Sequence, residues 1–387
     1  MDLRAGYHRW LFGETFLDLC RLLVDPAGVA GRGDLDWPFL VQLSSQHLVT
    51  TALAQAVRDA DGPPVPDEVR DFLASIERLN AARNARAVKE TRDLVAAFNR
   101  TGVRPLLLKG VAGLMTGLYP SPSWRLLADI DILVDDADRA GAERVLAALG
   151  YRQLPVAGEA ARDDHHHGAP WIHPSRRFEV ELHRRVLNPR CGTILAVRET
   201  FAEARSGDGD GIDYAVLAPT HAMIHLVAHA QLQNRYHALK LFELRTLLDG
   251  VCLEARCGKE IDAERVARAF DSVGAGRALA HFARLAATLL DRRLAGIGGN
   301  PPSAFLDELA TGLWMNHDGV RPLLLAAARL RAMPRLPARL VDHRWYAAKW
   351  RFWHLGRAER RRVVHGIRAR AVHGRALTGN RSQGRPG

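Results

Sequence analysis

The chain has 387 residues, of which 47% are hydrophobic and 25% charged, a composition typical of globular proteins that excludes wholesale disorder. This length allows one composite domain or two. The formal net charge of +11 is concentrated near the C-terminus, because residues 331–387 hold 15 Arg and Lys against two acidic residues. The preceding residues are close to neutral, so the total charge alone does not indicate nucleic-acid binding.

Cysteine usage and hydropathy exclude several other classes. The four cysteines are scattered, and Cys252 and Cys257 have no second pair, which argues against a disulfide framework or a zinc ribbon. The first residues lack the apolar stretch of a signal peptide, and there is no run of 18 apolar residues. We therefore expect a cytoplasmic protein.

The first 100 residues are predicted to form an N-terminal helical region. Apolar residues recur at three- and four-residue spacing in residues 15–24 and 39–58, and again from 69 to about 98 after a Pro/Gly-rich break. Within the pattern from 69 to about 98, we expect the charged residues Arg83, Arg86 and Glu90 to face solvent.

Residues 101–215 have a different pattern and are predicted to form a compact core of alternating strands and helices. Apolar runs and strict alternation indicate strands, and amphipathic spacing indicates helices. The predicted strands are 104–108, 129–134, 151–154 and 178–183, and the predicted helices are 110–118 and 137–149.

The rest of the chain is predicted to be helical from residue 216 to 335, followed by a basic, aromatic segment at 336–387 with a disordered end. The GDGDG stretch at 207–211 resembles the start of a calcium loop. However, Ile212 follows it and no Glu stands at the twelfth position, so a plain turn is the better interpretation.

Asp129 and Asp131 carry the strongest chemical signal. Residues i and i+2 of a strand project from the same face, so the two carboxylates lie side by side while Ile130 and Ile132 pack behind them. Two adjacent carboxylates repel unless a cation lies between them, and Mg²⁺ prefers such oxygen ligands. The alternative is a solvated polar face on an edge strand.

The predicted strand 178–183 supplies a third acid. Alternation puts Glu179, Glu181 and His183 on one face, and if this strand lies beside the first, Glu181 completes a three-carboxylate cluster. Upstream, Lys109 and Gly110 end a strand and open a helix, where backbone amides and a lysine can bind phosphate. Arg125 is either a second phosphate contact or a surface arginine.

Two groups of histidines are also candidates. His165, His166 and His167 lie in a polar stretch with Asp163, Asp164 and His173, which we interpret as an active-site loop rather than a transition-metal site. His221, His225 and His229 share one face of a predicted helix. This spacing can hold a metal but more often marks a helix beside a polar cleft.

The segment 343–362 interleaves aromatic residues with Arg and Lys. It could stack on nucleic acid or lie at an anionic membrane surface. We favour a helix that packs its aromatic side chains on the body of the protein.

The series LLLKGVAGLMTGLYPSPSWRLLADIDILV, VLAALGY and VELH resembles the uncharacterised nucleotidyltransferase family, relatives of the polymerase-β-like superfamily, over residues 35 to 250. The resemblance implies an α+β fold, a small mixed sheet flanked by helical regions, and nucleotidyl transfer from a magnesium-bound nucleoside triphosphate, with two metal ions. By matching positions, Asp129 and Asp131 are the metal-binding pair and Glu181 the third carboxylate, which helps to activate the acceptor. Lys109 and Gly110 stand at the superfamily's Gly-Ser phosphate-binding turn, and His225, His229 and Glu243 match a segment beside the acceptor pocket.

The sequence thus predicts a Mg²⁺-dependent nucleotidyltransferase. Its acceptor would be a hydroxyl or phosphate of a small molecule, a sugar or a peptide. Candidate ligand-binding residues besides the three acids are Lys109, Gly110, Arg125 and His183. Two alternatives stay open at this point: a non-catalytic module that uses the nucleotide cleft to bind a ligand or partner, and a basic nucleic-acid-binding protein.

Overall fold

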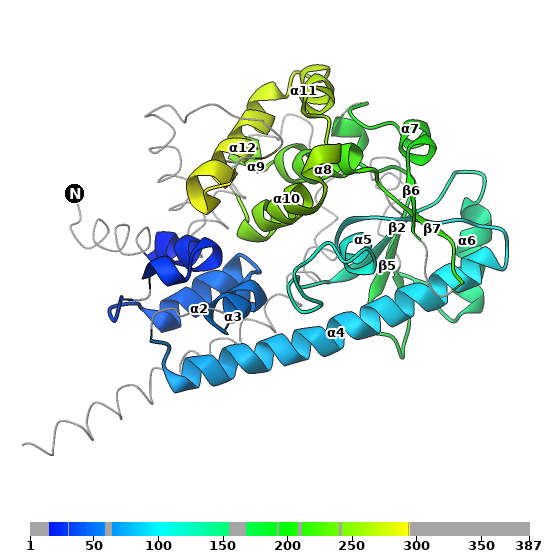
Figure 1. Cartoon of the computed structure of the whole chain (residues 1–387). Helices are drawn as coiled ribbons and strands as arrows, with labels where there is room; N and C mark the ends of the chain where they lie inside the picture. Colours follow the sequence, from blue (N-terminus) through cyan, green and yellow to red (C-terminus); the bar gives the residue numbers. More distant parts are fainter. Residues whose placement is uncertain are drawn as a thin grey trace, which may run out of the picture.

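A computed structural model describes residues 15–29, 31–58, 64–154, 168–191, 193–207, 211–239, 242–292 and 294. In these residues one mixed sheet is surrounded by helices, which confirms the α+β class (Figure 1). The predictions for His165–His167 and for the basic segment 336–387 fall outside the described residues. The predicted domain boundaries stay predictions.

The N-terminal helices agree with the periodicity except at one point. Residues 15–24 are helical, but the single helix predicted over 39–58 is wrong, because the chain forms α2 (Trp37–Gln46) and α3 (Thr50–Arg58). Leu48, between them, has a φ of 59°. Leucine normally has a negative φ, as in strands and helices. The left-handed Leu48 therefore interrupts the helix, which apolar spacing alone does not reveal.

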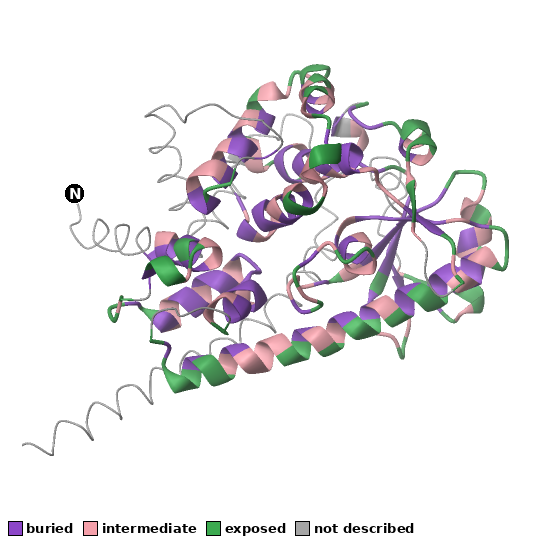
Figure 2. Ribbon diagram, in the orientation of Figure 1, coloured by how far each residue is buried: buried purple, intermediate pink, exposed green. Residues whose placement is uncertain are grey.

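Helix α4 (Asp67–Asn99) confirms the third predicted helix. It contacts the N-terminal helix α3 at one end and the sheet's helices α5 and α6 at the other. Its 33 residues correspond to about 50 Å at 1.5 Å per residue. In Figure 1 it runs from beneath α2 and α3 to beneath the sheet. Figure 2 shows buried and exposed residues alternating along it, as expected for a helix that packs one face on the body.

Two of the three charged residues expected to face solvent do not. Arg83 donates from Nε to the Leu127 carbonyl at 2.9 Å, and its guanidinium lies 4.9 Å from the centre of the Phe178 ring. Glu90 is buried and accepts a hydrogen bond of 2.7 Å from the Tyr151 hydroxyl. The prediction was therefore wrong for Arg83 and Glu90, because tertiary partners turn these charges inward.

The sheet has seven strands in the order β3-β4-β5-β2-β1-β7-β6. The pairs β2/β5 and β1/β7 are parallel, and the other neighbouring pairs are antiparallel. The strands are β1 (Leu106–Leu107), β2 (Asp129–Leu133), β3 (Arg152–Gln153), β4 (Trp171–Ile172), β5 (Glu179–His183), β6 (Arg205–Gly207) and β7 (Tyr214–Val216). Strands β4, β6 and β7 are two or three residues long and were not predicted.

Helices cover both faces of the sheet. Short 3-10 turns occur at Ala27–Val29, Pro189–Cys191 and Gly258–Glu260. The remaining helices are α5 (Lys109–Met115), α6 (Arg139–Ala148), α7 (Val197–Ala202), α8 (Pro219–Ala228), the π-helix η4 (His229–Gln233), α9 (Tyr236–Leu239), α10 (Leu244–Cys257), α11 (Ala263–Asp271) and α12 (Gly276–Leu290).

Alternation along the strands divides the apolar core in two. Ile130, Ile132 and Val180 belong to a cluster with side chains of α4 and α6. Leu106 and Leu133 belong to a second cluster, which joins the N-terminal helices to α8, α10 and α12. The odd-numbered residues of β2 and β5 therefore face α8 and its neighbours, which puts their acidic side chains on that side of the sheet.

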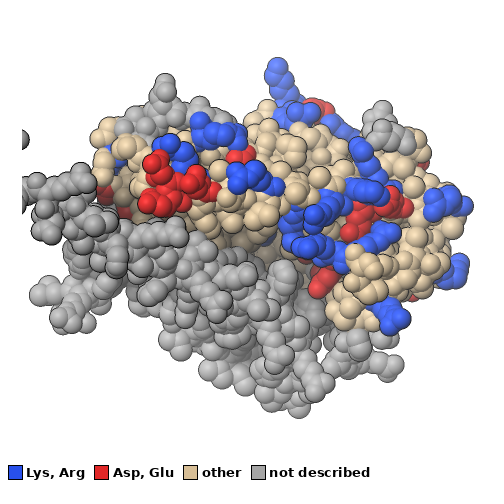
Figure 3. Space-filling model, turned by 90° about the horizontal axis from the view of Figure 1, so that it is seen from below, with Lys and Arg blue, Asp and Glu red and all other residues tan. Residues whose placement is uncertain are grey.

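The described helices are all too short or too polar to cross a membrane. On the face seen in Figure 3, basic side chains lie close to acidic ones, with uncharged surface between the groups.

The first prediction concerns Asn84, which ties α4 to the loop before β2. Its buried side-chain amide donates to the carbonyls of Pro122 and Arg125 at 2.7 and 2.8 Å. Because Asn84→Ala leaves two carbonyls without this donor, we expect the free energy of unfolding to fall by about 1–3 kcal/mol in denaturant titration. The control is Arg86→Ala on the exposed face of the same helix. Equal effects of the two substitutions would contradict the anchoring role.

Candidate functional site

The parallel pairing of β2 with β5 brings the predicted acids together. The register places Asp131 opposite Glu181 and Asp129 opposite Glu179. Asp131 and Glu181 are 1% and 5% exposed, whereas Asp129 is half-buried and Glu179 is exposed. The buried end of the strand pair therefore holds two carboxylates side by side.

Lys109 and His183 lie against these carboxylates. The Lys109 ammonium donates to Asp131 Oδ1 at 2.6 Å, and its Nζ is 3.9 Å from Glu181 Oε2. His183 Nε2 is 2.8 Å from the same Asp131 oxygen and 3.8 Å from Glu181 Oε2. The four side chains form a compact group, called here the acidic centre: Asp131, Glu181, His183 and Lys109.

Burial and charge act in opposite directions at this centre. Burial alone would raise the pKa of Asp131, but the Lys109 ammonium and the hydrogen bond from His183 hold that pKa well below its usual range. Burial would lower the pKa of Lys109, but Asp131 and Glu181 raise it above its usual value. Burial lowers the pKa of His183, so its ring is neutral at pH 7 and offers a lone pair or an N–H.

Lys109 reaches this place through an uncommon backbone conformation. It is the first residue of α5 and has a φ of 52°, in the left-handed region that non-glycine residues seldom adopt. The residue before it is fixed by a hydrogen bond from the Leu108 amide to the Asp131 carbonyl at 3.0 Å. Backbone strain of this kind is found most often at functional sites.

Gly110 and Arg125 pack against each other. A Cβ on Gly110 would collide with the Arg125 guanidinium and would come within 2.6 Å of the Leu127 side chain. Arg125 itself donates from Nε to both carboxylate oxygens of Asp249 in α10, at 3.1 and 2.9 Å. A larger residue at position 110 would therefore force Arg125 or Leu127 to move. Arg125 is a buried ion-pair partner rather than a surface arginine.

The structure separates the three spaced histidines. His225 is buried in α8, and the rings of His225 and His229 lie 5.9 Å apart. Burial, the Lys109 ammonium and His183 lower the pKa of His225 to about 3. Burial and Lys109 also lower the pKa of His229. The positive charge of Lys109 therefore contributes to the lowered pKa of both histidines.

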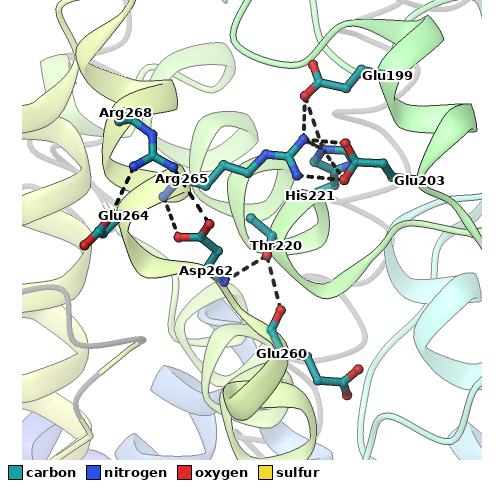
Figure 4. A network of polar contacts seen from close by, with 9 residues as sticks. All are labelled: Glu199, Glu203, Thr220, His221, Glu260, Asp262, Glu264, Arg265 and Arg268. Atoms are coloured by element: carbon teal, nitrogen blue, oxygen red, sulfur yellow. Dashed lines mark hydrogen bonds and ion pairs between the residues drawn. The ribbon is translucent and has the colours of Figure 1, made fainter.

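His221 belongs to a different network, at the junction of α7, α8 and α11 (Figure 4). Its Nε2 lies 3.0 Å from Arg265 Nη2. Arg265 also bonds both oxygens of Glu203 at 2.7 Å and one oxygen of Glu199. The guanidinium fills the space between the two acids and the ring, so this cluster already contains its cation.

Two further predicted residues have structural partners. Glu243 precedes α10 and accepts hydrogen bonds from Arg245 and Thr246 at 2.9 and 3.1 Å. His173 accepts a hydrogen bond from the Ser175 amide and packs on the Tyr151 ring. Neither is among the side chains of the acidic centre.

The donor atoms of the acidic centre fit a divalent metal. Among the described residues, one ligand atom each from Asp131, Glu181 and His183 lie within 4.8 Å of one another. Carboxylate oxygens suit Mg²⁺ and Mn²⁺, and an imidazole nitrogen suits Mn²⁺ and later transition metals better than Mg²⁺. Asp129, two residues before Asp131 in β2 and half-buried, is outside this group.

Two features around the acidic centre were not predicted from the sequence. Asp249, the partner of Arg125, is a single acid within the apolar stretch LLDGVCL, and a carboxylate on a buried helix face generally has a charged partner. The placement of Lys109 against Asp131 depends on its left-handed backbone, which no sequence pattern indicates.

A family model described as "uncharacterised nucleotidyltransferase" matches residues 33–291. The chain belongs to this family. All four residues of the acidic centre, together with Asp129, Gly110 and Arg125, lie within the matched range. Membership supports nucleotidyl transfer as the general class of activity.

One solved structure that resembles the chain is that of an antigenic nucleotidyltransferase-like protein from Paracoccidioides brasiliensis. The two are 11% identical, and the match covers 57% of this chain and 95% of that one, with a TM-score of 0.32. No curated protein shows significant similarity to the chain.

The second prediction follows from the buried, neutral His225. The unfolded state binds a proton near pH 6.5 but the folded state only near pH 3, so stability is lost as the pH falls below about 6.5. We expect His225 to cost about 2 kcal/mol of the free energy of unfolding between pH 7 and pH 5.

The measurement is denaturant titration at both pH values for the wild type and for His225→Asn, whose amide can replace the hydrogen bond to the Val186 backbone. The variant should lose less stability on acidification than the wild type. His173→Asn serves as the control. An unchanged acid sensitivity in His225→Asn would show that His225 is not the titrating group.

Proposed function

We propose that the chain is a metal-dependent nucleotidyltransferase. It transfers a nucleoside monophosphate from a nucleoside triphosphate, with Mg²⁺ or Mn²⁺, to a hydroxyl or phosphate of a small-molecule, sugar or peptide acceptor. The observation that carries the proposal is the register of β2 with β5, which buries Asp131 and Glu181 side by side next to a lysine. Family membership supports the general class of reaction.

The side chains of the acidic centre suit distinct tasks. Asp131, Glu181 and His183 would hold the metal, which when bound neutralises the oxygens of the attacked phosphate. Glu181 is also the group proposed to accept the proton of the acceptor. The Lys109 ammonium supplies positive charge for the triphosphate oxygens. A second metal ion would need the half-buried carboxylate of Asp129 as a further ligand.

Arg125, His225 and His229 would act at the edge of this centre. Arg125 is held by Asp249, and its contact with a phosphate stays a prediction. His225 lies in α8, which faces the acidic side of the sheet, and His229 begins η4 directly after it. We propose that both line the acceptor side. Phosphoryl-type transfer depends mainly on positioning and electrostatics, which a buried, charged centre can supply.

A non-catalytic ligand-binding module is the second candidate. The observation that favours it is the ammonium of Lys109, which already neutralises the two carboxylates without a metal. In that case the acidic centre would bind a triphosphate or a partner, and the protein would release no pyrophosphate.

The third prediction tests nucleotide binding. Each of ATP, GTP, CTP and UTP is added with Mg²⁺ or Mn²⁺ to the wild type and to Asp131→Asn, and the melting temperature is measured. We expect metal-dependent stabilisation by one triphosphate, about 2.7 kcal/mol at a hundredfold excess over Kd, and its loss in the variant. The control is Asp136→Asn, an exposed acid just after β2 that should behave as the wild type does.

Pyrophosphate release in the presence of candidate acceptors then separates the two functions. Asp131→Asn and Glu181→Gln should each reduce turnover at least about a hundredfold, because they remove a charge that acts on the reacting phosphate. Binding without turnover in the wild type would favour the ligand-binding module. No response to any triphosphate would contradict the transferase proposal.

A further inference from the structure

The ammonium of Lys109 lies against the same carboxylates that would ligate a metal ion. Its Nζ lies 2.6 Å from Asp131 Oδ1 and 3.9 Å from Glu181 Oε2, the oxygens that also converge with His183 Nε2. The Lys109 side chain is 20% exposed and both carboxylates are almost fully buried. The Lys109 ammonium is therefore the positive charge that lies next to the two buried carboxylates.

The backbone holds Lys109 in this place. Strand β1 pairs with β2, with Leu107 opposite Ile132, and the Leu108 amide bonds to the Asp131 carbonyl. Lys109 follows directly in a left-handed conformation, with a φ of 52°, which costs a non-glycine residue energy. A flexible surface lysine would need neither the anchor nor the strain.

A divalent ion and an ammonium cannot share this space. Both would contact Asp131 Oδ1, and two cations at such a distance repel strongly inside a protein, where screening by water is weak. When a metal binds, the ammonium must leave the carboxylates. The Lys109 backbone stays beside the centre, at the start of α5.

We propose that Lys109 is the built-in counter-ion of the acidic centre, which a divalent metal must displace, and that the displaced ammonium then contacts the triphosphate. The second half rests on the proposed function. The centre on its own then binds metal weakly, whereas metal and triphosphate together bind tightly because the triphosphate stabilises the displaced ammonium. This coupling is reciprocal: each ligand strengthens the binding of the other.

The test uses Mn²⁺ alone, without nucleotide, on the full chain. Binding is measured by calorimetry and by the spin-resonance signal of free Mn²⁺ for the wild type, Lys109→Met and Lys109→Arg. We expect Lys109→Met to bind Mn²⁺ at least tenfold more tightly than the wild type. Lys109→Arg keeps the charge and should stay weak. Adding Asp131→Asn to Lys109→Met should abolish the gain.

A second variant guards against misfolding. Lys109→Met leaves two buried carboxylates without their cation, so its melting temperature should fall without metal and recover with Mn²⁺. Lys109→Gly also removes the ammonium but relieves the left-handed strain, and should show the same gain in Mn²⁺ affinity. Equal or weaker Mn²⁺ binding in the folded variants, including no binding at all, would overturn the counter-ion role.

The outcomes are separable from those of the proposed function. If the wild type binds a triphosphate with metal but the Lys109 variants show no gain for Mn²⁺, the transferase stands and the counter-ion role fails. If the Lys109 variants gain Mn²⁺ affinity but no triphosphate binds, the counter-ion role stands and the transferase fails.

Discussion

The arrangement of the functional site depends on one constraint, the burial of two like charges where β2 and β5 run in parallel. With Asp131 opposite Glu181 and both nearly inaccessible to water, the fold needs a positive charge at that point. Two unpaired buried carboxylates would lose far more in solvation than the neighbouring apolar contacts return. Lys109 supplies the charge, and the same requirement makes the centre suitable for a divalent metal.

The rest of the fold buries and positions this centre. Helix α4 holds the loop before β2 through Asn80 and Asn84, whose amides donate to backbone carbonyls of that loop. Gly110, Arg125 and Asp249 pack α5, the same loop and α10 together on the other side. The N-terminal and C-terminal helices share one apolar core, for instance where Phe16 meets Phe242. Helices distant in the sequence therefore support one small sheet.

Much of this arrangement could be predicted from the sequence, because alternation along a strand is a local property. The strict pattern of DIDILV and FEVELH correctly gave strands β2 and β5 and their acidic face. What escaped prediction depends on tertiary contacts: the break of the second helix at Leu48, the two- and three-residue strands, and the inward turn of Arg83 and Glu90. The residue roles proposed for the site stay predictions until they are measured.

We infer that Asp131, Glu181 and His183 form one cation site. The most direct test of this inference is the electron spin echo envelope modulation of Mn²⁺ bound to the protein, because a nitrogen ligand leaves its own modulation on the metal's signal. We expect imidazole nitrogen modulation in the wild type and its loss in His183→Gln. Bound Mn²⁺ without nitrogen modulation, or the same modulation in His183→Gln, would contradict it.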